Sequence, residues 1–474
     1  MGFSFNRRVN TAICLGFLCG FLFGDTVWVN TGTYSSFPAS IQSGTQDNWK
    51  VYAGRGQEPV DVSVEPSGDL NISGVSCIIF QNIAFGQKSG MSGGENVYVY
   101  NSHHVYFKKC KFFSVNTGSL NPKDPQTGDL LKYHMVNDVL IEDCEFVNEN
   151  SFVYGSCDQY VDFLNVHDIV FRNNYFHDMF FSKSACVQFK GGSYNVLIEK
   201  CVFDSIGEGS ALRLGGSTGD QWIPNPSGPE GWNITVRNNV FINCPEQPID
   251  VYNGRDIRVH NNTFIGSGGA ATPGTWESGA GIFRVISSES DLDRAKSDSV
   301  WFINNLIWNP KGDLRSVADS YIRGDGAKSE NIWIENNLIW NGNGSVTKQL
   351  MDINGASSLK SMLDNNVMWN YWKYAVSNYR NNPVLDPTNT AFVKNNFITE
   401  PQMVVSDYNA SSFDHNGIDG LYEKMAAFAL LGNTSHAIDA GQELADVTHD
   451  FNGNARIGKP DIGAFEFGST SKIQ

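Results

Sequence analysis

The stretch Val170-Phe171-Arg172-Asn173-Asn174 contains the phrase that decides the fold, an alternation of apolar and polar residues closed by two asparagines. The phrase recurs along the chain in six further copies, which close at Asn239, Asn262, Asn305, Asn337, Asn366 and Asn396. Related copies close at Cys110, Cys144 and Cys201, and an earlier one, Phe80-Gln81-Asn82-Ile83, opens the series. The mean step is about 31 residues, and self-similarity at a period of about 20–50 residues indicates a solenoid.

The residue types in each copy indicate which solenoid this is. The copies use Val, Ile and Phe in apolar–polar alternation, which is typical of strands. Their apolar residues do not follow the three- and four-residue spacing of a helix. We therefore predict an all-β fold, a single-stranded right-handed parallel β-helix of about eleven coils with N-terminal and C-terminal caps.

The residue that closes each copy is expected to face the inside of its coil. An Asn there can hydrogen-bond through its side-chain amide to the equivalent residue of the next coil, and a Cys fits because it is small and readily buried. The step between copies varies from 23 residues, between Asn239 and Asn262, to 43 residues, between Asn262 and Asn305. Loops of unequal length are therefore expected to project from a regular core.

The composition limits the classes of partner. The 474-residue chain is long enough for a large core, and its formal net charge of −16 argues against a general nucleic-acid binder, which would show a basic surface. An acidic polymer is still compatible with this charge, because a local cationic cleft can focus its own field. We expect no nucleic-acid partner and a monomeric protein.

The N-terminus has the pattern of a secretory signal. Arg7 and Arg8 precede an apolar stretch at residues 12–23, which is too short to span a bilayer. We predict a signal peptide at residues 1–24, a β-helix body at 25–400 that begins with a strand at 25–29, and a C-terminal cap segment at 401–474. The mature protein is expected to be extracellular or periplasmic, without membrane attachment.

The C-terminal segment departs from the repeat. Its phrase Asp461-Ile462-Gly463-Ala464-Phe465-Glu466 resembles the closing segment of many secreted bacterial β-helix proteins. Because the end of a solenoid exposes an open strand edge, a capping role is expected. The Asp, Asn and Gly residues at 450–456 leave open a second interpretation, a cation site.

The cysteines do not indicate a disulfide framework. Removal of residues 1–24 leaves seven of the nine cysteines, an odd number, and three of them close copies of the repeat. We expect Cys110 and Cys144 to be stacked thiols. No cysteine spacing resembles a zinc site.

Counting back from the closing residues identifies a charged column. Lys132, Asp162 and Asp250 lie twelve residues before Cys144, Asn174 and Asn262, and a repeated Gly-Gly-Ser phrase at 191–193 and 215–217 places Arg213 in the same column. Side chains alternate across a strand, and the flanking column is apolar. The charged column should therefore face outward.

One coil requires a shift of register. Without it, Lys190 would point into the core as an unpaired charge, which is costly. A one-residue shift or bulge before Gly191 turns Gln188 and Lys190 outward, with Lys190 in the next outward column beside His134. Asp129 and Glu208 are expected at the margin of this face.

Two long loops accompany the column. Residues 215–232 and 266–281 are rich in Gly and carry Trp222, Trp232 and Trp276. Aromatic residues on such loops can stack on sugar rings, or they can form a small satellite core. The substrate-binding candidates are Gln188, Asp250, Glu208 and these three tryptophans.

A salt-bridged outer strand face is the plain structural interpretation of the column. Three observations favour a functional one. The column is flanked by the longest and most aromatic loops, its charges are clustered in the middle of the solenoid, and nearby Gly pairs allow a ligand to approach the backbone.

The stretch from Val187 to Gly215, which includes Lys190-Gly191-Gly192-Ser193 and Arg213, resembles the central coils of alginate lyases and chondroitinase B. The resemblance implies a polysaccharide lyase in which Lys190 is the base and Arg213 assists. The chain departs from this family where an acidic pair binds calcium, because Lys183-Ser184-Ala185-Cys186 stands there. We name no metal ligand, and calcium is left open as a cofactor.

The outward face could supply the groups that β-elimination on a uronate-containing glycan requires. Lys132 or Arg213 could neutralise the carboxylate, Lys190 could remove the C5 proton, and His134, Tyr133 or Tyr252 could protonate the leaving oxygen. A glycoside hydrolase is the alternative, with Asp162 or Asp250 paired with Asp129 or Glu208. A non-catalytic glycan-binding solenoid is the third.

Overall fold

The computed structural model describes residues 23–34, 37, 40–56, 59–64, 70–87, 95–114, 128–148, 159–244, 247–268, 281–287, 295–308, 316–322, 329–340, 351–354, 362–364, 367–369, 376–379, 393–394, 431–445 and 447–468. Residues 1–22, most of the expected signal peptide, lie outside this part. Strand β1 (Phe23–Val29) covers the expected first strand. The domain boundaries stay predictions.

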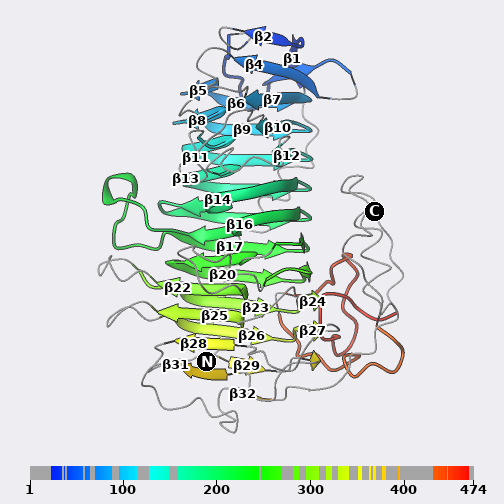
Figure 1. The fold of residues 1–474 in the computed structure, drawn as a ribbon. Coiled ribbons are helices and arrows are strands. Elements are labelled where there is room, and N and C mark those ends of the chain that lie inside the picture. The colour runs from blue at the N-terminus through cyan, green and yellow to red at the C-terminus, as the bar shows by residue number, and fades with distance from the viewer. Residues whose placement is uncertain are drawn as a thin grey trace.

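The described strands stack in parallel as three long sheets, one strand above the next (Figure 1). Sheet I contains β5 (Leu70–Ser73), β8 (Val97–Tyr100), the first part of β11 (Leu131–Glu142) and of β13 (Val161–Arg172), the last part of β14 (Tyr175–Lys190) and of β16 (Val202–Gly215), β19 (Ile249–Tyr252), β22 (Gly281–Ser287), β25 (Ser316–Ile322), β28 (Met351–Asn354) and β31 (Val376–Tyr379).

Sheet II contains β1, β3 (Trp49–Gly54), β6 (Ser76–Gln81), β9 (His103–Lys108), the last part of β11 and of β13, β15 (Ser193–Glu199), β17 (Gly231–Arg237), β20 (Gly254–His260), β23 (Asp298–Ile303), β26 (Glu330–Glu335), β29 (Met362–Asp364) and β32 (Val393–Lys394). Sheet III contains β2 (Gly32–Tyr34), β4 (Val60–Val64), β7 (Ile83–Gln87), β10 (Lys111–Ser114), β12 (Glu145–Asn148), the first part of β14 and of β16, β18 (Val240–Ile242), β21 (Thr263–Ile265), β24 (Leu306–Trp308), β27 (Leu338–Trp340) and β30 (Val367–Trp369). The predicted right-handed parallel β-helix is confirmed.

The two asparagines that close each copy have different structural roles. The first adopts the left-handed conformation that Asn tolerates well, with φ of 54° at Asn173 and 56° at Asn238, and so turns the chain between sheets II and III. The second points inward and is buried. Together they explain why the phrase needs two asparagines.

The inward asparagines form the predicted ladder. The Oδ1 of Asn262 accepts hydrogen bonds from the backbone N–H and the Nδ2 of Asn239, both at 3.0 Å. Asn305 receives the same pair of bonds from Asn262, and Asn337 receives it from Asn305. The expected rungs at Asn366 and Asn396 lie outside the described residues. Each rung fixes the height of its coil against the next.

Aromatic rings fill the interior beside the ladder. Phe146, Phe176 and Phe203 belong to one stack, with ring centroids 4.6 Å and 4.7 Å apart. Tyr133, Phe163 and Phe189 form a second stack behind sheet I. All six are fully buried. Tyr133 therefore cannot protonate a substrate, because its alternation along β11 turns it into the core.

The described cysteines are thiols, as expected. Cys110 and Cys144 are buried neighbours on the ladder, with the Cys110 N–H 3.4 Å from the Cys144 Sγ. Within the described residues, no disulfide joins the cysteines at 77, 110, 144, 186, 201 and 244. No helix in the described part of the chain is long and apolar enough to cross a membrane.

The described part of the C-terminal segment lies along the side of the coils, next to β24 and β27 (Figure 1). Phe451, Ile462 and Phe465 pack against the outer face of sheet III, which includes Leu306 and Leu338. The expected cap included residues 401–430, which lie outside the described residues. The part that is described covers a flank of the stack.

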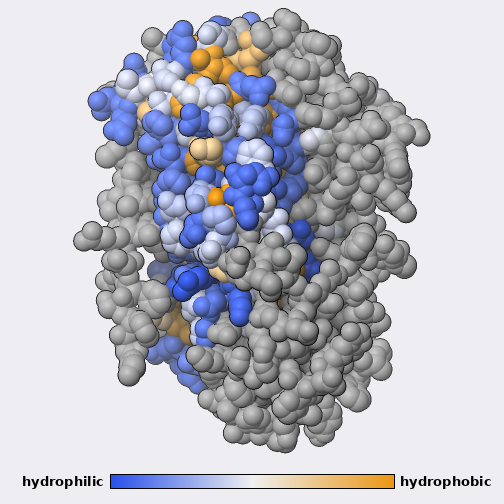
Figure 2. Space-filling view, turned by 90° about the vertical axis from the view of Figure 1, so that its left-hand side faces the viewer, coloured by the Kyte–Doolittle hydropathy of each residue, from blue (hydrophilic) through white to orange (hydrophobic). Residues whose placement is uncertain are grey.

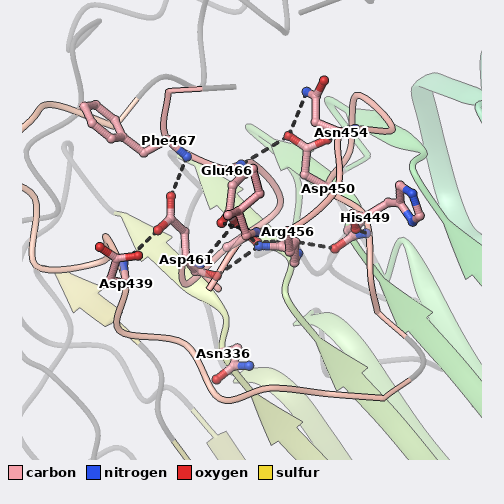
Figure 3. Close-up of polar contacts among 12 residues, drawn as sticks. Asn336, Asp439, His449, Asp450, Asn454, Arg456, Asp461, Glu466 and Phe467 are labelled. Carbon is pink, nitrogen blue, oxygen red and sulfur yellow. Dashed lines mark hydrogen bonds and ion pairs between the residues drawn. The ribbon is translucent and has the colours of Figure 1, made fainter. Parts of the chain in front are cut away.

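Carboxylates accept hydrogen bonds within the described C-terminal segment and stabilise its loops (Figure 3). Asp450 accepts hydrogen bonds from the N–H groups of Asn454 and Glu466, and Asp461 accepts from Asp439 and Phe467. The buried Arg456 forms an ion pair with Glu466 at 3.0 Å. These carboxylates brace the segment, which supports a structural role over the alternative cation site.

The same segment is joined to the ladder turns of the coils. The Nδ2 of Asn261 donates to the His449 carbonyl at 2.7 Å, and Asn336 exchanges two hydrogen bonds with the backbone of Gln442. The first asparagine of a copy thus also anchors the flanking segment where that segment passes.

We predict that Asn262→Ala lowers the free energy of unfolding by about 3 kcal/mol or more, because it leaves buried polar groups of the neighbouring rungs unpaired. Chemical denaturation followed by circular dichroism measures this. Asn225→Ala, on an exposed loop, is the control and should change stability little. Equal stability of the two variants would contradict the structural role of the ladder.

Candidate functional site

The charged column lies on sheet I in the predicted register. Successive pairing partners along the sheet are Tyr98, Lys132, Asp162, Gln188, Arg213, Asp250 and Arg284. The places expected for Lys132, Asp162, Arg213 and Asp250 in one column are therefore confirmed. The column faces away from the aromatic interior, yet little of it is exposed, and Asp162 is only 1% accessible.

The predicted shift of register also occurs. Leu164 pairs with Lys190 and His167 pairs with Tyr194, so the one extra residue lies between Lys190 and Tyr194, at the Gly191-Gly192 phrase. As a result Gln188 joins the outward column and Phe189 is fully buried. Lys190 pairs with Leu164, which pairs with His134. Lys190 and His134 thus share the next column and lie two coils apart, on either side of Leu164.

These two columns form the floor of an open cavity of about 730 Å³. The loop between β16 and β17, drawn in green at the left of Figure 1, rises beside it. Figure 2 views this side of the molecule, whose described surface is mainly hydrophilic. The cavity is lined by Tyr98, Tyr100, Lys132, His134, Gln159, Asp162, Leu164, Gln188, Lys190, Arg213, Ser217, Thr218, Gly219, Trp222 and Tyr252.

Asp162 joins the two lysines at the floor. Its Oδ2 is 3.1 Å from the Nζ of Lys132, and its Oδ1 is 3.1 Å from the Nζ of Lys190. Lys132 also contacts Asp129 at 3.2 Å and Glu95 at 3.4 Å. Burial alone would lower the pKa of Lys132, but the three carboxylates outweigh it and raise the pKa above its ordinary value. Lys132 is therefore a permanent cation.

His134 is the one imidazole among the described residues that line the cavity. Its Nδ1 lies 3.0 Å from the hydroxyl of Tyr98, and its ring packs edge-on against Trp222. Burial lowers the pKa of His134, and the Lys132 ammonium lowers it further, against a smaller opposing effect of Asp162. His134 is therefore a neutral imidazole at neutral pH.

Asp250 was expected to bind substrate, and the structure gives it another position. It is fully buried, and it accepts hydrogen bonds from Arg213 at 2.8 Å and from Arg284 at 2.9 Å and 2.7 Å. Burial would raise the pKa of Asp250, but Arg284 and then Arg213 lower it below its ordinary value. Asp250 does not line the cavity; it holds Arg213, which does.

The three tryptophans predicted to bind substrate do not lie together at the cavity. Trp222 lies on the short 3-10 helix η1 (Asp220–Trp222), is half exposed and lines the cavity. Trp232 lies in β17, stacks on Tyr194 at 4.4 Å and does not line the cavity, because it belongs to sheet II. Trp276 and the side chain of Glu208 lie outside the described residues.

Several cavity residues were not predicted, among them Tyr98, Tyr100 and Gln159. Tyr98 could have been found, because it lies twelve residues before Cys110, at the count that located Lys132. Arg284 could not, because the step from Asn262 to Asn305 contains long insertions that break the count.

Glu230 was also missed, and it braces the cavity wall. Its buried carboxylate accepts hydrogen bonds from the N–H of Gly191 at 2.8 Å and from the N–H and the hydroxyl of Thr218, both at 2.7 Å. Gly191 directly follows Lys190, and Thr218 lies on the loop that carries Trp222. Glu230 thus fixes the position of the wall relative to the floor.

The protein-family model described as "Right handed beta helix region" matches residues 62–282, which include the coils that form the cavity. This match covers less than half of the chain, whose described strands have the right-handed parallel β-helix fold. No curated protein sequence matches it significantly.

Solved structures with a similar fold include the surface adhesin PfbA of Streptococcus pneumoniae, at 12% identity and a TM-score of 0.45, covering 82% of this chain and 94% of that one. The alginate lyase AlyF-OU02 is similar at 11% identity and a TM-score of 0.44, covering 85% and 88%. The exopolygalacturonase of Thermotoga maritima is similar at 11% identity and a TM-score of 0.40, covering 78% and 84%. At these identities the likeness concerns the fold alone.

The calcium site implied by the lyase resemblance does not fit this chain. Ala185 and Cys186 stand where that family has part of its acidic segment, and both are fully buried. Across the described residues, no group of three or more His, Cys, Asp or Glu side chains is arranged to hold a metal ion. The cations that face this cavity are lysines and an arginine.

We predict that Glu230→Ala destabilises the protein by about 2–5 kcal/mol, because three buried donors lose their acceptor. Denaturant unfolding measures the loss. Glu443→Ala, at an exposed position, serves as the control. A Glu230→Ala variant as stable as that control would contradict the bracing role.

Proposed function

We propose that the protein is a secreted polysaccharide lyase that cleaves a uronate-containing glycan by β-elimination. The observation that supports this is the pairing, in one open cavity, of fixed cations with a neutral histidine. Such a cavity can bind an acidic sugar and accept a proton from it at neutral pH.

The first requirement is neutralisation of the substrate carboxylate. Lys190 and Arg213 lie on neighbouring coils and line the cavity, with Lys190 paired to Asp162 and Arg213 paired to Asp250. We assign carboxylate binding to these two residues. Lys132 is surrounded by three carboxylates and instead keeps Asp162 in place.

The second requirement is a base for the C5 proton. The lyase resemblance implied Lys190, but its ammonium is engaged in an ion pair with Asp162 at 3.1 Å. We therefore assign the base to His134. In the tautomer that donates its Nδ1–H to the Tyr98 oxygen, the other ring nitrogen keeps its lone pair for the proton.

The elimination then balances as follows. The C5–H bond breaks and its proton passes to His134, the electron pair forms the C4–C5 double bond, and the C4–O bond breaks. The leaving oxygen takes a proton from the Lys190 ammonium, and proton return from His134 through solvent restores both residues. Trp222 and Tyr100 offer aromatic faces for the sugar rings.

The hydrolase alternative has less support. A glycoside hydrolase needs two carboxyl groups that face the same bond. Among the described residues that line the cavity, Asp162 is the one carboxylate, and both of its oxygens contact lysines. Asp129 contacts Lys132, and Asp250 lies between two arginines.

A polysaccharide panel tests the reaction. We expect an ultraviolet-absorbing unsaturated product from at least one uronate-containing glycan, and a loss of at least about 100-fold in kcat/KM for both Lys190→Ala and Arg213→Ala. Lys459→Ala, at an exposed position, should leave the rate unchanged. New reducing ends without the chromophore would establish a hydrolase, and binding without turnover would establish a glycan-binding protein.

The pH profile tests the base. The reaction needs neutral His134, and its pKa is lowered, so the neutral form persists to lower pH than for an ordinary histidine. The acid limb of kcat/KM should therefore lie below about pH 6.5 and disappear in His134→Gln along with most of the activity. An acid limb well above pH 7 would rule out His134 as the base.

A further inference from the structure

Gln159 lines the cavity and lies two residues before β13. Its side chain is buried, with the residue 3% accessible, and its Nε2 donates to the Oε1 of Gln188 at 2.8 Å. The Nε2 of Gln188 in turn donates to the carbonyl of Gly215 at 3.1 Å. Two amide side chains and one backbone carbonyl thus form a chain across the site.

The direction of this chain is fixed by chemistry. The Gly215 carbonyl can only accept a hydrogen bond, so Gln188 must direct its NH₂ group towards it and its oxygen towards Gln159. Gln159 must then direct its own NH₂ group towards Gln188. Its Oε1, a buried atom of a side chain that lines the cavity, receives no hydrogen bond from any residue in the described part of the chain.

A buried acceptor without a donor is costly, and in a binding cavity it is a place for a ligand donor. The nearby ammonium groups do not supply one, since Lys132 and Lys190 are directed to Asp162. Because the ring of a glycan bound there carries hydroxyl groups, a sugar hydroxyl is the donor that fits.

We propose that Gln159 accepts a hydrogen bond from a free hydroxyl of the sugar bound beside Lys190. The substrate is then an acidic glycan that is not O-acetylated or O-sulfated at that position. This inference rests on the proposed function, since it places a sugar in the same cavity. A substituted oxygen has no proton to donate, and the Gln159 acceptor would stay unpaired.

The form of the site makes this discrimination strong. Sites built to hydrogen-bond a hydroxyl reject substrates that lack it far more effectively than apolar pockets do, because their buried polar groups are left unpaired.

The test compares one acidic glycan in O-acetylated and fully de-acetylated form. Turnover is followed as unsaturated product, and binding of oligosaccharides from each sample is measured by calorimetry. The wild type should prefer the de-acetylated sample by at least about 100-fold in kcat/KM. Gln159→Leu should lose most of this preference by becoming slower on the de-acetylated sample.

Two further variants keep the result interpretable. Gln159→Met repeats the test should the Leu variant fold poorly, and Gln221→Leu makes the same change at an exposed residue of the adjacent loop that does not line the cavity. Gln221→Leu should keep the wild-type preference.

The outcomes separate this inference from the proposed reaction. A preference in binding that Gln159→Leu abolishes, without turnover of any sample, would overturn the lyase and support the role of Gln159. Turnover with the same preference in the wild type and in Gln159→Leu would support the lyase and overturn the role of Gln159. A wild type that binds neither sample would overturn both.

Discussion

The structure depends on one constraint, the hydrogen bonding of each inward asparagine to the next along the stack. Because Asn262 accepts both donors of Asn239 and gives both of its own to Asn305, each coil is held at a fixed height and register relative to its neighbours. Strands that are far apart in the sequence then present the same position to the same face. A cavity can be assembled from Tyr98, Lys132 and Arg213 only because this register holds over several coils.

Charged columns as such are not sites. Sheet II carries one as well, in which Lys108, Glu142, Arg172, Glu199 and Arg237 alternate in sign with contacts of 2.7–3.6 Å. In that column each charged side chain forms an ion pair with a side chain of opposite sign on a neighbouring coil, and these pairs stabilise the stack. The column on sheet I differs because the loop between β16 and β17 rises beside it, which leaves an open cavity over Asp162 and its two lysines.

Periodicity in the sequence was sufficient for the fold and for part of the cavity floor. The count of twelve residues works wherever the strand of sheet I and the ladder are joined without insertion, as for Lys132 and Asp162. It fails where a long loop intervenes, so Arg284 could not be placed. It also does not reach Glu230, which directly precedes a strand of sheet II. The roles of residues were harder to predict than their positions. Asp250 was predicted to bind substrate and is instead buried between two arginines. The ion pair of Lys190 depends on a contact between coils, which the sequence does not show.

The central claim is that the register of the ladder turns separate coils into one binding cavity for an acidic sugar. A crystal structure of the His134→Gln variant soaked with a uronate oligosaccharide tests it most directly. The account predicts a sugar ring over Leu164 between positions 134 and 190, with its carboxylate at Lys190 and Arg213. An oligosaccharide bound on another face, with this cavity empty, would contradict it.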